Sequence, residues 1–128
     1  MSSKFQILIR QFEQAVGKLS DALEQKKNEY IRDSSIQRFE VTFELAWKAI
    51  KAFLEEQGIT AYSPRECMKG ALKTGLIEDN PDWLRMIELR NLTSHTYNEE
   101  VAEEIYAALP GLLVLYKKLL AELKNAEQ

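Results

Sequence analysis

The sequence is poor in cysteine and in the residues that interrupt helices. It contains 5 glycines, 3 prolines and 1 cysteine in 128 residues. Glycine and proline are the residues that destabilise a helix interior most, so their scarcity permits long helices. The single cysteine, Cys67, cannot form a disulfide within the chain, which favours a reducing compartment.

Long hydrophobic runs and an excess of positive charge are also missing. No apolar segment approaches the roughly 20 residues that a membrane span needs, and the segment from Met1 to Phe5 lacks the layout of a secretory signal peptide. We therefore expect a cytoplasmic protein that does not associate with a membrane. The formal net charge is -3, so a polyanion such as RNA would have to bind a local basic patch.

Helix-forming residues are abundant, and apolar residues recur at steps of three and four along two segments of the first half. The first stripe is Phe5, Leu8, Phe12, Val16, Leu19 and Leu23, and the second is Ile36, Phe39, Phe43, Trp47, Ile50 and Leu54. The polar run 25–29 is predicted to be the solvated end of the first helix. Ser34 and Gln37 form a capping-box pattern that predicts the start of the second helix, and Gly58 predicts its end.

Local start and stop signals predict three further helices in the second half. Residues 63–66 place a cap, a proline and a capping-box glutamate in order, so a short helix should run from Pro64 to about Thr74 and end at Gly75. The pair Asn80-Pro81 repeats the start signal for a fourth helix.

The last apolar stripe predicts a long helix from Glu99 onward, and Pro110 should kink or interrupt it. This stripe is Val101, Ile105, Leu109, Leu112, Tyr116, Leu119 and Leu123. The predicted fold class is all-α: an up-and-down four-helix bundle with one additional short helix. We expect a single domain over residues 1–128.

The helix that starts at Pro81 carries an unusual polar cluster. Its inward stripe can be followed through Leu84 and Ile87, and the next positions on that face are Asn91 and then Ser94 or His95. A buried polar group without a partner costs on the order of 1–3 kcal/mol. The pattern therefore predicts a hydrogen-bond network, a cleft or a subunit interface, unless the helix ends early and Asn91 and His95 merely cap it.

The residue types of this cluster suit cleavage of a phosphodiester by a ribose 2′-OH. That reaction needs proton transfer and a cation near the phosphorus. His95 suits the proton transfer, Arg90 offers a forked cation matched to phosphate, and Asn91 can orient either. The chain has only this one histidine, so a symmetric dimer would supply the second proton-handling group.

Other chemistries find little support in the sequence. One histidine and one cysteine do not make a zinc-ligand pattern, and neither a P-loop nor a dinucleotide fingerprint is present. We therefore expect no metal and no cofactor. A nucleophile–base pair of Ser94 with His95 is unattractive, because adjacent helical residues diverge.

The spacing of Arg90, His95 and Tyr97 resembles the Arg-x4-His-x-Tyr signature of HEPN (higher eukaryote and prokaryote nucleotide-binding) proteins. Further blocks resemble the small bacterial and archaeal subgroup known as nucleotidyltransferase substrate-binding proteins, over roughly Phe5 to Leu123. These blocks cover residues 36–40, 43–48, 63–66 and 75–77.

The resemblance implies a homodimeric four-helix bundle that acts beside a separate minimal nucleotidyltransferase. In one interpretation of the family, the HEPN chain presents substrate to the transferase. In the other, the pair is a toxin–antitoxin system: the HEPN chain is a metal-independent ribonuclease with Arg90 and His95 in the catalytic positions. The partner then silences it by transferring AMP to the tyrosine that matches Tyr97, which places bulk and negative charge near Arg90.

Three residues are candidates for supporting roles. Arg38 and Glu44 belong to the second-helix block and either pair with the site residues, bind the partner or form an ordinary surface ion pair; Ser94 shares the predicted face of Asn91. Three hypotheses stay open: a ribonuclease, a non-catalytic subunit that binds RNA or a nucleotide, and a purely structural assembly protein. Association of the dimer into a higher oligomer also stays open.

Overall fold

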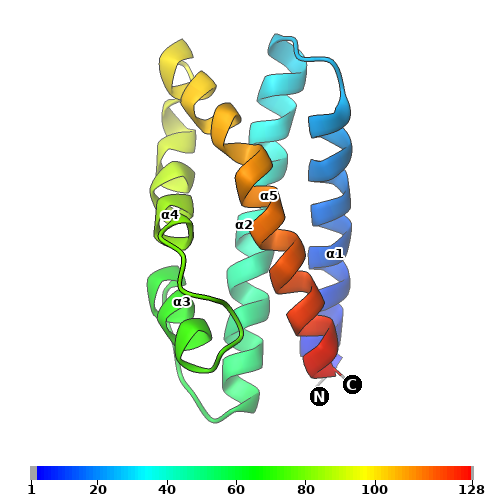
Figure 1. Ribbon diagram of the computed structural model, residues 1–128, viewed down its shortest axis with the longest axis vertical. Coiled ribbons are helices and arrows are strands. Elements are labelled where there is room, and N and C mark those ends of the chain that lie inside the picture. The colour runs from blue at the N-terminus through cyan, green and yellow to red at the C-terminus, as the bar shows by residue number, and fades with distance from the viewer. Residues whose placement is uncertain (1–2, 128) are drawn as a thin grey trace.

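The computed structural model describes residues 3–127. It contains five α-helices and one 3-10 turn, and no strand occurs within those residues (Figure 1). The elements are α1 (Ser3–Glu24), α2 (Glu29–Glu56), α3 (Pro64–Lys73), α4 (Asp82–Leu92), the turn η1 (Thr93–His95) and α5 (Glu99–Glu127). Met1, Ser2 and Gln128, and with them the start of the segment that lacks a signal-peptide layout, lie outside the described residues.

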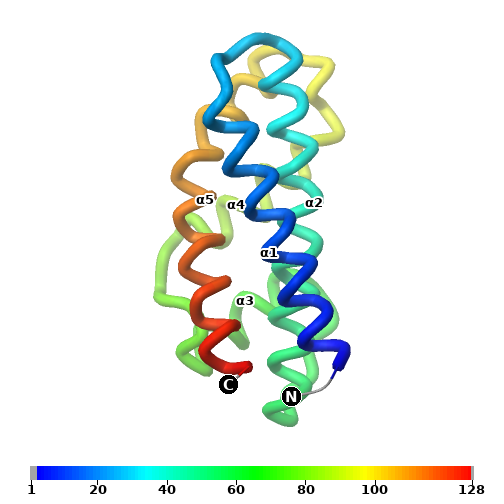
Figure 2. The backbone as a smooth tube through the Cα atoms, turned by 90° about the vertical axis from the view of Figure 1, so that its right-hand side faces the viewer, coloured from blue at the N-terminus to red at the C-terminus, as the bar shows by residue number. Residues whose placement is uncertain are grey.

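The three long helices, α1, α2 and α5, pack against one another, while α3 and α4 together form the fourth column of the bundle. The helices run up and down in chain order, with α3 inserted between α2 and α4. Both ends of the chain lie at one end of the bundle, and the α4–α5 connection lies at the other (Figures 1 and 2). The predicted all-α up-and-down bundle with one additional short helix is therefore confirmed.

The apolar stripes supply the core. The largest fully buried side chains come from every long helix and from α4: Phe5, Phe12, Ile9, Leu19, Phe39, Phe43, Ile50, Leu54, Met86, Leu89, Ile105 and Tyr116. Each such apolar side chain contributes roughly 1.5–3 kcal/mol by leaving water. The periodicity of the sequence thus locates the core correctly on α1, α2 and α5.

The predicted stops of α2 and α3 are confirmed. Gly58 and Gly75 have φ angles of 75° and 77°, a left-handed conformation that glycine adopts without a Cβ penalty. After each of them a backbone N–H bonds back into the last turn, from Ile59 to the Leu54 carbonyl at 2.8 Å and from Leu76 to the Ala71 carbonyl at 2.9 Å. Both helices therefore end in a Schellman motif.

The predicted start of α2 was wrong by six residues, or about 1.7 turns. The helix begins at Glu29, and the Asn28 side chain caps it by accepting a hydrogen bond from the Ile31 N–H at 2.8 Å. Ser34 lies inside the helix, because no residue between 28 and 34 breaks it and Asn28 is an equally good cap. The polar run 25–29 is accordingly the α1–α2 connection and the first residue of α2 rather than the end of α1.

Pro110 does not interrupt α5, which runs as one α-helix from Glu99 to Glu127. Pro110 is exposed, and on the solvent side of a helix water can hydrate a carbonyl that has lost its N–H donor. Packing of the flanking buried residues Leu109 and Leu112 holds the two halves in one helix. In this way α5 spans the bundle from the α4–α5 connection to its opposite end.

Candidate functional site

The buried face of α4 differs from the predicted one. Trp83, Met86 and Leu89 are the buried residues of the helix, whereas Leu84 is 43% exposed. The predicted buried face, which runs from Leu84 through Ile87 to Asn91, is therefore wrong. The observed buried face is displaced by about one residue around the helix. The indole of Trp83 and the thioether of Met86 bury more apolar area than Leu84 and Ile87 would, which selects this rotation.

A consequence is that the polar cluster lies on the surface of the chain. Arg90, Asn91, Ser94, His95 and Tyr97 are all exposed, Tyr97 to 82%. The cluster is therefore not a closed network in the core. Within residues 3–127 the Asn91 side chain makes no hydrogen bond.

The helix also ends earlier than the stripe implied, at Leu92, and continues as the single turn η1. Hydroxyl groups satisfy the carbonyls at this end: Thr93 donates to the Arg90 carbonyl at 2.6 Å, and Ser94 donates to the Asn91 carbonyl at 3.3 Å. Ser94 thus has a structural role in the turn. Because these hydroxyls take over the capping, the side chains of Asn91 and His95 are left available for other contacts.

His95 and Tyr97 contact each other beside this turn. The Nδ1 atom of His95 lies 3.3 Å from the Tyr97 hydroxyl, and their rings meet edge to face at a centroid distance of 5.9 Å. Which of the two donates depends on the tautomer of the imidazole. The contact places a phenol oxygen within proton-transfer reach of the only histidine in the chain.

Arg90 is oriented by residues of α2. Its Nη2 atom donates to Glu44 Oε1 at 2.5 Å, and its Cζ atom lies 5.8 Å from the ring centroid of Phe43. The other oxygen of Glu44 accepts a hydrogen bond from Trp47 Nε1 at 3.0 Å. The Arg90 side chain is 44% exposed, so this pair contributes little stability, and within residues 3–127 the other guanidinium N–H groups of Arg90 make no hydrogen bond.

The structure brings Glu44, but not Arg38, to the predicted site. Glu44 binds Arg90 directly, as a supporting residue should. Arg38 lies on the side of α2 that faces α1, where it lines a groove with Lys18 and Val41. In the sequence Trp47 belongs to the second apolar stripe, and no pattern points to its indole N–H as the second donor to Glu44.

A second charged cluster that the sequence did not reveal joins the start of α5 to α2. Arg32 is only 4% exposed, and its guanidinium donates to Glu99 at 2.6 Å and to Glu103 at 3.1 Å. The hydrogen bonds to Glu99, Glu103 and Asp33, in that order, raise the pKa of Arg32 above its usual value, and Arg32 in turn lowers the pKa of Glu99. Because α5 begins directly after Tyr97 and Asn98, this cluster fixes the segment that carries Tyr97.

Tyr116 is the buried neighbour of the site on α5. It is fully buried against Phe12, in an edge-to-face contact at 5.9 Å, and within the described residues its hydroxyl has no hydrogen-bond partner. Burial, and to a smaller extent the charge of Glu44, raises the pKa of Tyr116 well above its usual value. Tyr116 is therefore a neutral core residue rather than a proton-transfer group.

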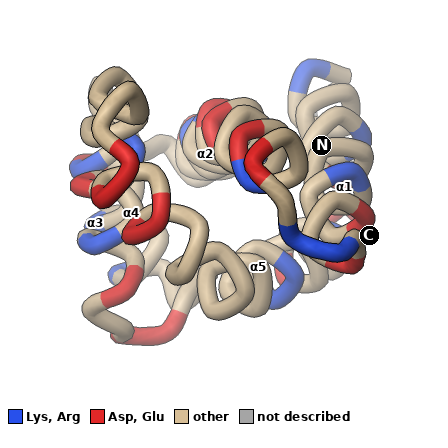
Figure 3. Tube along the Cα trace, turned by 90° about the horizontal axis from the view of Figure 1, so that it is seen from above, with Lys and Arg blue, Asp and Glu red and all other residues tan. Residues whose placement is uncertain are grey.

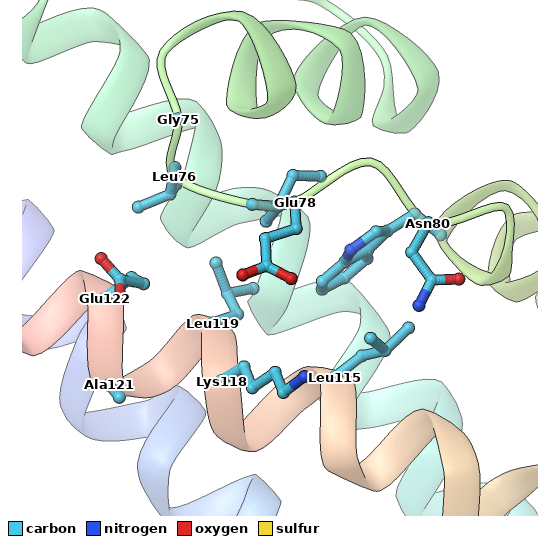
Figure 4. A pocket seen from close by; sticks show the side chains of 11 residues that line it. Gly75, Leu76, Glu78, Asn80, Leu115, Lys118, Leu119, Ala121 and Glu122 are labelled. Carbon is cyan, nitrogen blue, oxygen red and sulfur yellow. The ribbon is translucent and has the colours of Figure 1, made fainter.

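Three hollows on the described surface lie elsewhere. The largest, about 380 Å³, is formed by the α3–α4 connection and the second half of α5 around Trp83, Glu78 and Lys118 (Figure 4). The second, about 300 Å³, is the α1–α2 groove, and the third, about 230 Å³, surrounds Arg32. None of the three is lined by Arg90, Asn91, His95 or Tyr97.

Charge is not segregated at the end of the bundle that carries η1. Figure 3, which views the molecule from that end, shows Lys and Arg interspersed with Asp and Glu. Within residues 3–127, no three or more His, Cys, Asp or Glu side chains are grouped so that they could hold a metal ion. Over the same residues, no helix is both long and apolar enough to cross a membrane.

Comparison with known proteins identifies the relatives of this chain. The family described as nucleotidyltransferase substrate binding protein like matches residues 4–125. The probable ribonuclease HepT of Haemophilus influenzae is 35% identical over 99 residues, and the match covers 73% of this chain and 68% of that protein.

Two solved structures share the fold. A crystal structure from Thermus thermophilus is 37% identical, with a TM-score of 0.82 over 88% of this chain and 98% of that one. A structure from Haemophilus influenzae, described as revealing the fold of a substrate binding domain of a nucleotidyltransferase, is 29% identical. Its TM-score is 0.70, over 94% of this chain and 96% of that one.

Proposed function

The chain belongs to the family of nucleotidyltransferase substrate-binding proteins, and from this premise we propose that it is a metal-independent ribonuclease controlled by a separate nucleotidyltransferase. The observation that carries the proposal is the arrangement on one exposed segment of an oriented cation, Arg90, and a histidine–tyrosine contact, His95 with Tyr97. The similarity to a probable ribonuclease from Haemophilus influenzae supports it independently.

The proposed reaction is attack by a ribose 2′-oxygen on the adjacent phosphorus. A bond forms between that oxygen and phosphorus, the bond to the 5′-oxygen breaks, and the products are a 2′,3′-cyclic phosphate and a 5′-hydroxyl. His95 takes the 2′ proton, and the free N–H groups of Arg90 bind the phosphate oxygens as charge builds on them. Asn91 lies on the same turn and is exposed, so its amide is positioned to orient the substrate.

The leaving 5′-oxygen needs a proton from a second group. One chain offers a single histidine, and the side chains of the cluster are exposed. We therefore propose a symmetric homodimer in which His95 of the partner subunit donates this proton and the two surfaces together form the cleft. Closure by a second copy would also exclude water and strengthen the interactions of Arg90 with phosphate.

Tyr97 is the proposed site of control. In this step the phenol oxygen forms a bond to the α-phosphorus of ATP, pyrophosphate leaves and the phenol proton passes to solvent or to His95. Tyr97 is 82% exposed, so a transferase can reach its hydroxyl, which lies 3.3 Å from His95. An attached AMP would occupy the space beside His95 and bring a phosphate close to Arg90, where it would compete with RNA.

A second candidate is a non-catalytic subunit that binds RNA or a nucleotide and presents it to the transferase. The open, unenclosed position of the cluster in one chain favours it, since binding needs less exclusion of water than catalysis does. Arg90, Asn91 and Tyr97 would then bind phosphate, ribose and base without any bond cleavage. The Haemophilus influenzae structure described as a substrate binding domain is consistent with this role.

Cleavage of RNA by the purified chain in the presence of EDTA separates the two candidates. The ribonuclease proposal expects products with 2′,3′-cyclic phosphate ends, and it expects His95→Ala to lower the rate at least ~100-fold with an unchanged circular dichroism spectrum. Arg85→Ala, on the same helix but outside the cluster, is the matched control and should cleave normally. Equal cleavage by His95→Ala and the unaltered chain contradicts the proposal; tight RNA binding without cleavage supports the second candidate.

A further inference from the structure

A groove between α1 and α2 has the composition of a phosphate-binding surface. It is lined by Gln11, Gln14, Ala15, Lys18, Arg38, Val41 and Leu45 and encloses about 300 Å³. The lining holds two cations and two amide side chains, and it includes no carboxylate. The chain as a whole carries a net charge of -3, but the charged side chains that line this groove are both positive.

Neither cation in the groove is neutralised by the rest of the chain. Within residues 3–127, Lys18 and Arg38 form no ion pair, whereas nearby Glu13, also on α1, is paired with Lys124. Their side chains therefore keep all their N–H donors for an external acceptor. Guanidinium and ammonium groups are the side chains that bind phosphate oxygens most strongly.

The two helices that form the groove, α1 and α2, lie side by side (Figure 2). The buried hydroxyl of Thr42 is 3.3 Å from the Ala15 carbonyl on α1 and donates at 2.6 Å to the Arg38 carbonyl on its own helix. The small side chain of Ala15 allows this close approach. The groove is therefore preformed, and its volume is at the lower end of the range for small-ligand sites, which suits one phosphate and its sugar.

The groove and the proposed cleavage site flank the same exposed strip of α2. Arg38 lies six residues before Glu44, the partner of Arg90, which corresponds to about 9 Å along the helix and roughly 120° around it. A single strand that crosses this strip, over Val41, would reach both places within a few nucleotides. Val41 is 45% exposed and offers an apolar surface for a base or a sugar.

We propose that the α1–α2 groove is a second RNA-binding site, in which Lys18 and Arg38 bind a backbone phosphate a few nucleotides away from the one held by Arg90. The inference takes from the proposed function only that the ligand is RNA. It explains how a chain with a net negative charge binds RNA: cations at two separate places on the surface bind the same RNA strand. A second copy of the chain is the competing occupant of the groove, because of the exposed Val41 and half-buried Leu45, and the experiment distinguishes the two.

The test uses a fluorescein-labelled single-stranded RNA of mixed sequence and the His95→Ala chain, so that the RNA stays intact. Binding is measured by anisotropy at several salt concentrations for the double variant Lys18→Gln/Arg38→Gln. We expect the affinity to fall on the order of tenfold at 0.1 M salt and the slope of log K against log[salt] to fall by about 0.7, as for one lost phosphate contact on a single strand. Arg38→Lys should retain most of the affinity, because the cation remains.

The control is Lys73→Gln, an exposed cation on α3 outside the groove, which should bind as the His95→Ala parent does. Unchanged affinity and salt slope in the double variant overturn the inference. A change in sedimentation coefficient with unchanged RNA affinity also overturns it and assigns the groove to a contact between copies. Reduced RNA binding by the double variant supports the groove even if the unaltered chain does not cleave RNA, a result that would contradict the ribonuclease proposal alone.

Discussion

Tyr116 shows, at the scale of a single residue, how the fold separates packing from chemistry. Its ring fills the core against Phe12, but within the described residues its buried hydroxyl has no partner. Burial raises the pKa of Tyr116 well above the usual value near 10. The unfolded chain therefore loses this proton at a lower pH than the folded chain does, and stability must fall as the pH rises above about 10.

We predict that Tyr116→Phe is neutral or stabilising by roughly 1 kcal/mol at neutral pH, because it removes an unsatisfied polar group and keeps the ring. Above pH 10 the variant should lose less stability than the unaltered chain. Urea unfolding followed by circular dichroism at pH 7 and pH 10.5 measures both effects. A destabilisation of more than about 1 kcal/mol at pH 7 would show that the hydroxyl has a partner in solution.

Tyr97 is the opposite case, a tyrosine whose hydroxyl is exposed and in contact with His95. Incubation with ATP and the partner nucleotidyltransferase should add the mass of one AMP to the chain, and Tyr97→Phe should stay unmodified. Tyr62→Phe is the matched control, because Tyr62 is 77% exposed but lies outside the cluster. Intact mass spectrometry with peptide mapping provides the measurement; modification at any other residue would refute the assignment.

At the scale of elements, the position of Tyr97 depends on how α5 is attached to α2. Arg32 makes this attachment through Glu99 and Glu103 on α5, whose carboxylates accept from its guanidinium, and Asp33 on α2 itself accepts a further hydrogen bond from Arg32. The pKa values of Glu99 and Glu103 are lowered, mainly by hydrogen bonds from Arg32 and Lys27 respectively. Carboxylates of this kind stabilise the fold above their unfolded pKa near 4.5, and the contribution disappears as the pH falls below it.

Replacing Arg32 with methionine should therefore lower the thermal midpoint at pH 7 and reduce the loss of stability between pH 5 and pH 3. Arg85→Met is the control: Arg85 pairs with Glu88 and Glu104, but its side chain is 41% exposed, so its removal should cost less. Differential scanning fluorimetry across this pH range makes the comparison. Identical midpoints for the two variants at pH 7 would contradict a special role of the Arg32 cluster.

Elements also show where local sequence signals suffice and where they fail. The start of α3 at Ser63 and the ends of α2 and α3 at Gly58 and Gly75 depend on residues only a few positions apart, so these boundaries were predictable. The start of α2 was not, because Asn28 and Ser34 are comparable caps and only the attachment of Arg32 to α5 favours the earlier one. The rotation of α4 about its own axis was also ambiguous, because apolar residues occur on two adjacent faces of this helix.

At the scale of the whole molecule, the cluster of Arg90, His95 and Tyr97 lies on an open surface that none of the three hollows includes. If a homodimer forms the cleft, specific ribonuclease activity should fall when the chain is diluted below its dimer dissociation constant. Activity per chain at a series of concentrations, compared with sedimentation equilibrium over the same range, measures this. Constant activity per chain in samples that are fully monomeric would contradict a shared site.

The sequence by itself determined the fold class, the core faces of the long helices and two helix ends, because these follow from periodicity and from chemistry within one or two turns. It also singled out Arg90, Asn91, His95 and Tyr97, through residue type and through the resemblance in their spacing. Only the tertiary structure decided that these residues are exposed, that Glu44 orients Arg90 and that Arg38 instead lines a groove with Lys18. Such relations join residues distant in the chain, and the rotation of one helix against another depends on the total area buried rather than on any local pattern.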